Sequence, residues 1–200
     1  MSYNKFTLDR VKTDFELTLE EERSLFPNPP ELQPSALLQQ ILQAYLPLAL
    51  AINSEKARSE FILAPVLADL KHQSDRTLSL FSGKEFNVDS ERGLTGFCDF
   101  ILSKSKEQLF IEAPVLTIIE AKNEDVIGGL GQCGAAMIAA REFNEKKKQN
   151  FPQIYGAVTT GNIWRFLRLE DSTLAIDKDE YYIKELPKIL GILSLPFREE

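Results

Sequence analysis

The chain has 200 residues, of which 44% are hydrophobic and 26% are charged, with 10 Gly and 10 Pro. This composition is typical of a globular protein and excludes a disordered or collagen-like chain. The 23 Lys and Arg and the 30 Asp and Glu give a formal net charge of −7, which excludes a broad cationic surface for nucleic acid but not a local basic groove.

A chain of this length can fold around one core, so we expect a single domain over residues 34–200, preceded by an N-terminal arm over residues 1–33. In the arm, Thr18 and Glu21 have the spacing of a capping box and predict a short helix from Thr18 to Leu25. Three closely spaced prolines then stop regular structure and mark a linker.

The first ten residues lack the apolar run of a signal peptide. The longest nearly apolar run, residues 44–52, is far shorter than the roughly 20 residues that a membrane-spanning helix needs. We therefore expect a cytoplasmic protein with no membrane partner. In that compartment Cys98 and Cys133 are expected to be reduced thiols rather than a disulfide.

The remaining segments predict an α/β (mixed α+β) domain, with a mixed sheet and helices on its faces. Apolar residues at helical spacing predict helices over 35–52 and 54–72, with Pro65 either kinking the second or opening a new helix in its first turn. Gly161-Asn162 predicts a tight hairpin. Strands are predicted over 78–81, 85–88, 96–102, 115–122, 154–160 and 163–169, and further helices over 126–148 and 185–195.

Charged residues interrupt two of the predicted strands. Glu120 and Lys122 end a strand whose earlier residues are all apolar or Thr, and the period of 2 puts both side chains on one face. Asp99 lies between Cys98 and Phe100 in another strand. A buried charge loses its solvation, so each of these groups needs a partner or a metal ion.

Two carboxylates that converge without a cation repel each other and one becomes protonated, whereas Mg²⁺ accepts several oxygens and keeps both ionised. Lys122 beside such an ion would orient the attacking water and the scissile phosphate. The pattern therefore suits metal-assisted phosphodiester hydrolysis. An ordinary ion pair of Lys122 with Glu120 or Asp99 at a sheet edge is the alternative.

With these residues the chain resembles the PD-(D/E)XK nuclease superfamily, whose restriction-endonuclease-like core has the order αβββαβ. Glu60 matches the acid of the N-terminal helix, Asp99 matches the strand aspartate, and Glu120-Ala121-Lys122 match the (D/E)-x-K signature. The resemblance covers roughly residues 54–170. The Pro that precedes the Asp in the family's motif is missing here.

The resemblance implies a hydrolase of nucleic acid, with DNA as the expected partner, that uses Mg²⁺ or Mn²⁺ and positions its water with Lys122. Some related exonuclease-type members carry a Gln on the following helix that organises the site, and Gln132 is placed for that role. An ordinary helix residue at Gln132 is an equal alternative. The implied metal ligands are Glu60, Asp99, Glu120 and the backbone carbonyl of Ala121.

Two other interpretations of the function stay open, and the nuclease interpretation carries one further expectation. A non-catalytic binding or assembly module would keep the fold without the activity, and the net charge of −7 favours it. The glycines of residues 129–134 spell G-x-G-x-x-G, a dinucleotide-binding pattern, although close packing of a helix on the sheet explains them better. Cutting both DNA strands takes two active sites, so a homodimer through the 35–52 helix and the arm is also expected.

Overall fold

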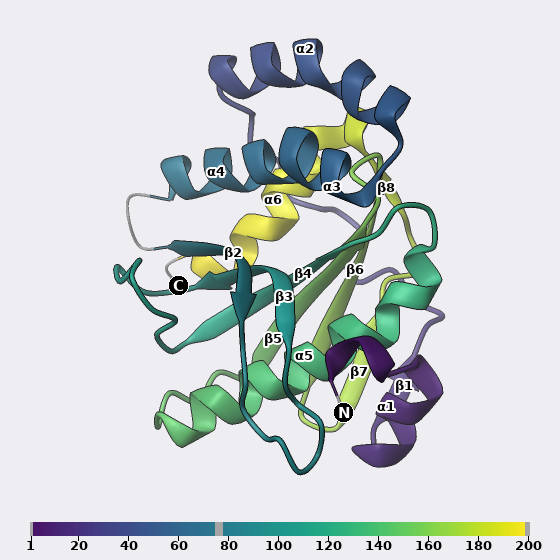
Figure 1. Ribbon diagram of the computed structural model, residues 1–200, viewed down its shortest axis with the longest axis vertical. Helices are drawn as coiled ribbons and strands as arrows, with labels where there is room; N and C mark the ends of the chain where they lie inside the picture. Colours follow the sequence, from purple (N-terminus) through teal and green to yellow (C-terminus); the bar gives the residue numbers. More distant parts are fainter. Residues whose placement is uncertain (1, 75–77, 199–200) are drawn as a thin grey trace.

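The fold is built on one mixed sheet, seen in a computed structural model that describes residues 2–74 and 78–198 (Figure 1). The strands lie in the order β1-β7-β6-β5-β4-β3-β2, with β8 beside β6, and the pairs β4–β5 and β1–β7 are parallel while the others are antiparallel. The strands are β1 (Thr18–Glu20), β2 (Ser79–Glu85), β3 (Phe97–Ser103), β4 (Val115–Ala121), β5 (Gln153–Thr159), β6 (Ile163–Glu170), β7 (Thr173–Ile176) and β8 (Tyr181–Tyr182).

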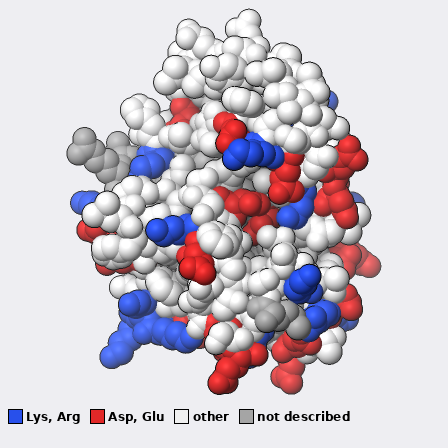
Figure 2. All heavy atoms as spheres, in the orientation of Figure 1, with Lys and Arg blue, Asp and Glu red and all other residues white. Residues whose placement is uncertain are grey.

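Helices cover both faces of the sheet. Helices α2, α4 and α6 pack on one face and helices α1 and α5 on the other, and α2 forms the outermost layer, at the top of Figure 1. In Figure 2 this end of the molecule is almost free of charged side chains. The helices are α1 (Leu8–Asp14), α2 (Ala36–Ile52), α3 (Glu55–Arg58), α4 (Ala64–Gln73), α5 (Val126–Lys146) and α6 (Leu186–Ser194), with 3-10 turns η1 (Tyr3–Lys5), η3 (Ile183–Glu185) and η4 (Leu195–Phe197) and a π-helical turn η2 (Ser59–Leu63).

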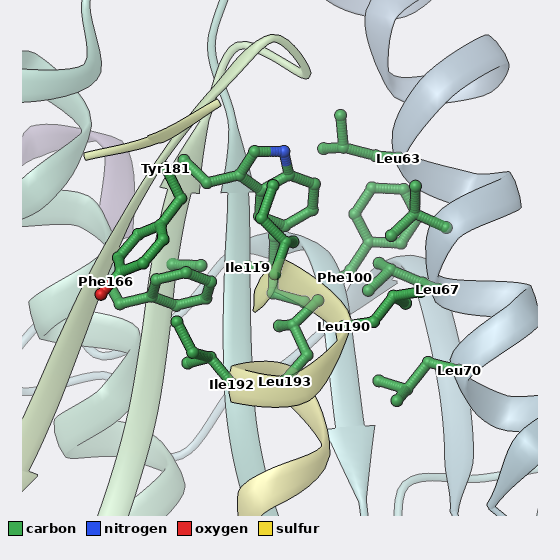
Figure 3. Packing of buried hydrophobic residues seen from close by; sticks show 14 of the residues in the cluster. Leu63, Leu67, Leu70, Phe100, Ile119, Phe166, Tyr181, Leu190, Ile192 and Leu193 are labelled. Atoms are coloured by element: carbon green, nitrogen blue, oxygen red, sulfur yellow. The ribbon is translucent and has the colours of Figure 1, made fainter. Parts of the chain in front are cut away.

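Each face of the sheet has its own hydrophobic cluster, and the larger one lies under α4 and α6 (Figure 3). There Leu67 and Leu70 of α4 and Leu190 of α6 close over Phe100 and Ile119 of the sheet. Burying one such side chain contributes about 1.5–3 kcal/mol. None of the helices in the described residues combines the length and apolarity needed to cross a bilayer.

The predicted helices before the sheet are confirmed, with one addition. The helix predicted over 35–52 is α2, whose N-cap Ser35 accepts a hydrogen bond from the Leu38 backbone N–H. The segment over 54–72 divides as Pro65 predicted, because Pro65 lies in the first turn of α4. A π-helical turn, η2, joins α3 to α4, and no feature of the sequence pattern indicated it.

The sheet is larger than predicted. The strands expected over 78–81 and 85–88 are one strand, β2, which passes through Gly83 at a φ of +58°. Glycine adopts this conformation without strain and so does not separate two strands here. Strands β7 and β8 were not predicted, because both are too short for an alternating pattern to stand out. The hairpin at Gly161-Asn162 is confirmed between β5 and β6.

The N-terminal arm differs most from expectation. The helix predicted from Thr18 to Leu25 is wrong, because Thr18–Glu20 form β1, which pairs with β7 in parallel register. The helix lies earlier, at α1, where Val11 is buried against α5. Phe26, at the start of the proline-rich segment, is buried in the cluster under α6. The arm therefore contributes to both faces of the core.

The glycines of α5 serve close packing. They lie inside the helix, which begins at Val126, and not in a turn between a strand and a helix. A methyl group added at Gly129 would lie 2.6 Å from Val158, and one at Gly131 would collide with the backbone of Thr7. The dinucleotide-binding interpretation is therefore wrong, because its glycines have to form the phosphate-binding turn before the helix.

Candidate functional site

The acidic cluster forms where β3 and β4 separate. Their backbone pairing ends at Phe100 and Ile119. Beyond that pair the Asp99 carboxylate Oδ2 accepts a hydrogen bond of 2.7 Å from the Ala121 backbone N–H. A side chain thus satisfies the donor that a neighbouring strand would otherwise satisfy, and the Asp99 carboxylate is held at the carboxyl end of β4.

A chain of hydrogen bonds joins three of the predicted site residues. The ammonium Nζ of Lys122 donates to the amide oxygen of Gln132 at 3.0 Å, and the Gln132 amide nitrogen donates to Glu120 Oε2 at 2.7 Å. Only this orientation of the amide satisfies both neighbours, because an ammonium only donates and a carboxylate accepts. Gln132 therefore positions Lys122 and Glu120 relative to each other.

The close approach of α5 makes this chain possible. Gly129 leaves no room for a side chain, because a methyl group there would lie 3.0 Å from carbons of the Lys122 side chain. The Lys122 stem therefore lies against the first turns of α5, and Gln132, one turn later on the helix, reaches the ammonium. The glycine motif noted in the sequence thus supports the site by its small size.

Glu120 is completely buried. Burial raises the pKa of its carboxyl well above its ordinary value, the charge of Asp99 acts in the same direction, and the ammonium of Lys122 partly opposes them. The charge of Glu55 also raises this pKa. A cation bound beside Glu120 would lower this pKa again, because it favours the ionised carboxylate.

The buried Glu120 also leaves one hydrogen-bonding position unfilled. Its Oε1 has no hydrogen-bond partner, although it is shielded from solvent. A buried, unpaired carboxylate oxygen is costly, and a hard cation is the ligand that would satisfy it together with Asp99. The residues present therefore fit a divalent cation, although no group of three or more His, Cys, Asp and Glu side chains around one point is found among residues 2–74 and 78–198.

Glu60 lies apart from this cluster. Its side chain is 53% exposed, pairs with Lys56 at 3.0 Å and lines a groove between α2 and α4. Glu55, at the first turn of α3, is the helix acid whose charge reaches Glu120. The structure therefore brings together Asp99, Glu120, Lys122 and Gln132, and does not bring Glu60 to them. Ser54 is an N-cap residue, and its position before Glu55 was the feature of the sequence that could have indicated Glu55 in the first turn of a helix.

Sequence reasoning missed a second network beside the cluster. The Arg58 guanidinium donates to the Thr160 carbonyl at 2.8 Å and to the Asn53 amide oxygen at 2.7 Å, and Asn53 in turn bonds Glu124 at 3.4 Å. These contacts tie the turn between α2 and α3 to the loops that follow β4 and β5. No periodicity or motif marks these residues, since Arg58 ends α3 and the others come from three separate loops and turns.

Two buried thiols lie near Glu120. Cys98 and Cys133 are both free, and burial followed by the charge of Glu120 raises the pKa of each thiol. Thiols kept neutral behave as small apolar side chains and add to the low polarity around the Glu120 carboxyl.

Neither protein-family models nor curated proteins match this sequence. The geometry of the chain itself indicates what the cluster can do. That geometry supplies two coupled carboxyls, an ammonium and an amide at one end of the sheet.

Proposed function

We propose that the protein is a divalent-metal-dependent nuclease that hydrolyses phosphodiester bonds of DNA, with a restriction-endonuclease-like core of the PD-(D/E)XK type. The observation that carries the proposal is the buried Glu120, with one unpaired oxygen, coupled to Asp99 and linked through Gln132 to Lys122. The order of elements from α4 through β2, β3, β4, α5 and β5 agrees with the αβββαβ core.

Each residue has a defined part in this proposal. Asp99, Glu120 and the backbone carbonyl of Ala121 would hold Mg²⁺ or Mn²⁺, which supplies Lewis-acid charge and lowers the pKa of a water molecule. The Lys122 side chain would bind a non-bridging oxygen of the scissile phosphate. Gln132 fixes the ammonium by accepting its hydrogen bond. The buried surroundings strengthen both interactions.

Cleavage assays with two variants test the proposal. Labelled single-stranded and double-stranded DNA are incubated with the wild type, Asp99→Asn and Lys122→Ala in Mg²⁺ or Mn²⁺. We expect each variant to lose about 1,000-fold in rate, because Asp99→Asn removes a carboxylate ligand of the cation and Lys122→Ala removes the group that binds the scissile phosphate. Lys12→Ala, on the exposed side of α1, is the matched control and keeps full activity. Unchanged cleavage by either site variant would contradict the assignment, provided that circular dichroism shows an intact fold.

Calorimetry with Mn²⁺ tests the cation site without a known substrate. The wild type should bind Mn²⁺ saturably, and Asp99→Asn should lose that binding because one of two carboxylate ligands is removed. Absence of binding at millimolar Mn²⁺ would make the cluster a structural ion-pair network.

A non-catalytic binding module is the second candidate function. The net charge of −7 and the acids Glu55, Glu124 and Asp125 near the cluster oppose tight binding of a polyanion. Saturable Mn²⁺ binding with no cleavage of DNA or RNA would favour this candidate over the nuclease.

A further inference from the structure

A cavity lies at the end of the sheet where β4 and β5 begin, next to the end of α5 (Figure 1). Its volume of about 560 Å³ is within the range of roughly 300–1,000 Å³ that is typical of small-molecule sites. We call it the amino-end pocket. Its polar and aromatic lining consists of Lys104, Asn150, Phe151, Gln153, Tyr155 and Arg198.

The sheet separates the amino-end pocket from the acidic cluster. Leu116 of β4 lines the pocket, and Glu120 lies four residues later on the same strand, which corresponds to about 13 Å of extended backbone. Every residue of β4 is buried, so the strand offers no open path between the two places. A small ligand in the pocket is therefore out of contact with the acidic cluster, and the pocket is a site of its own.

The charge of the pocket is opposite to that of the chain. Lys104 and Arg198 line it, and no described lining residue is Asp or Glu, although the chain has a net charge of −7. The Lys104 ammonium forms no hydrogen bond or ion pair within residues 2–74 and 78–198. The Arg198 Nε donates to Ser194 Oγ at 3.1 Å, which positions the guanidinium. The pocket is thus suited to an anion.

Two aromatic rings give the pocket a second property. Phe151 and Tyr155 line it, and Phe26 stacks on Tyr155 with 6.5 Å between the ring centroids and 26° between the planes. The Tyr155 hydroxyl donates to the Gln153 amide oxygen at 2.8 Å. Burial raises the pKa of this hydroxyl, so it stays neutral and does not repel an anion. Fixed aromatic rings of this kind stack with nucleobases.

Amide groups complete the chemistry of the pocket. The Gln153 amide accepts from Tyr155 and donates to Glu170 at 3.1 Å, and the charge of Glu170 is paired with Arg168 at 3.8 Å. The Asn150 amide, in contrast, forms no hydrogen bond in the part of the chain that the structure describes. A free Asn amide can pair with both N6 and N7 of adenine.

We propose that the amino-end pocket binds a free nucleoside monophosphate. The base lies against Phe151 and Tyr155 with Asn150 at its edge, and the phosphate accepts hydrogen bonds from Lys104 and Arg198. Two cations alone fit any anion and two rings alone fit any flat apolar group, whereas a nucleotide uses both. A nucleic-acid strand is the less suitable occupant, because its further phosphates would meet a chain with a net charge of −7.

Calorimetric titration of the full chain with AMP, in EDTA and without metal, tests the pocket. We expect a dissociation constant on the order of 10–100 µM. Adenosine and inorganic phosphate each make part of the contacts and should bind at least about 10-fold more weakly. An oligo-dA strand without terminal phosphates should not compete with AMP. Absence of AMP binding at millimolar concentration, equal binding of adenosine or inorganic phosphate, or tighter binding of the strand overturns the proposal.

Variants of the lining locate the nucleotide. Lys104→Ala should weaken AMP binding at least about 10-fold, because it removes a contact to the phosphate. Lys106→Ala is the matched control, since this lysine is exposed in the same loop and does not line the pocket. Phe151→Leu keeps an apolar side chain but removes the ring, and it should weaken AMP binding about 10-fold. Unchanged AMP binding in either lining variant, with an intact fold by circular dichroism, contradicts the proposal.

Variants of the acidic cluster separate this proposal from the nuclease proposal. Asp99→Asn and Lys122→Ala should bind AMP as the wild type does, because the cluster lies at the other end of β4. Loss of AMP binding in Lys122→Ala together with normal binding in Lys104→Ala would place the nucleotide at the acidic cluster and overturn the proposal. AMP binding that depends on Lys104 in a protein that cleaves no DNA would contradict the nuclease proposal alone.

Discussion

Two fully buried carboxyl groups, Asp177 directly after β7 and Glu120 in β4, differ in how their oxygens are bonded. The Oδ1 of Asp177 accepts from the backbone N–H groups of Leu25 and Asp179, and its Oδ2 accepts from the Tyr181 hydroxyl. Glu120 accepts one bond, from Gln132, and its other oxygen has no partner. Burial raises the pKa of both groups.

The difference separates a structural acid from a site acid. Asp177 joins the end of β7 to Leu25, 152 residues earlier in the chain, and both of its oxygens accept hydrogen bonds. Glu120 is also fully buried but has one oxygen without a hydrogen-bond partner, and the charge of Asp99 adds to the rise of its pKa. An unfilled bonding position on a buried charge is destabilising unless a ligand fills it, so it identifies the functional group of the two.

The largest expected change in the free energy of unfolding comes from substituting Asp177. Asp177→Ala leaves two backbone N–H groups without an acceptor in the core, so we expect the free energy of unfolding to fall by about 3 kcal/mol. Chemical denaturation measures this change. Asp177→Asn keeps one acceptor oxygen and should cost less than half as much. Equal losses in the two variants would mean that the hydrogen bonds to Asp177 are not what stabilises the arm.

At Glu120 we expect a substitution to raise the free energy of unfolding rather than lower it. Its pKa is raised in the folded protein, so its stabilising contribution is complete below the ordinary value of 4.5 and is lost as pH rises through the folded value. Glu120→Gln removes the charge and keeps the shape. It should stabilise the metal-free protein by about 1–2 kcal/mol at pH 8 and by nothing measurable at pH 4. A loss of stability at pH 8 would show that the carboxylate is already satisfied without a cation.

Most of the elements that carry the candidate site could be predicted from the sequence. Helix α2, strand β4 and helix α5 follow strong periodic patterns, and they position Glu120, Lys122 and Gln132. The helix acid whose charge acts on Glu120 is Glu55, whereas Glu60 lies in the π-helical turn η2, which the pattern does not indicate.

Long-range packing set the elements that were missed. Strand β1 forms because residues 18–20 find an open edge at β7, which overrides a local capping pattern. The role of Asp177 is equally hidden, since its partner Leu25 is distant in sequence. Local spacing therefore predicted most of the candidate site, while pairing across the chain decided the arm.

A bound cation should offset the free-energy cost of burying the Glu120 carboxylate and so raise the free energy of unfolding. At a Mn²⁺ concentration ten times its dissociation constant, binding adds about 1.4 kcal/mol to the free energy of unfolding. The cation competes with the proton for Glu120, so binding should strengthen as pH rises toward the raised pKa of Glu120. Thermal unfolding with and without Mn²⁺, at pH 5 and pH 8, measures both effects. Glu120→Gln serves as the control and should show neither. Equal stabilisation at the two pH values would place the cation elsewhere.

The smallest expected effect concerns Gln132, which makes the one hydrogen bond that Glu120 accepts. That bond favours the ionised carboxylate, so Gln132→Ala should raise the pKa of Glu120 further and move the pH at which Mn²⁺ binds upward by about half a unit. The change corresponds to about 0.7 kcal/mol. Calorimetric titrations across pH distinguish this role from a structural one, because a packing defect lowers stability without moving the pH profile. Gln40→Ala, on the exposed side of α2, should leave the profile in place. A profile that stays fixed in Gln132→Ala would mean that Lys122 and Asp99 set the protonation of Glu120 without help from the amide.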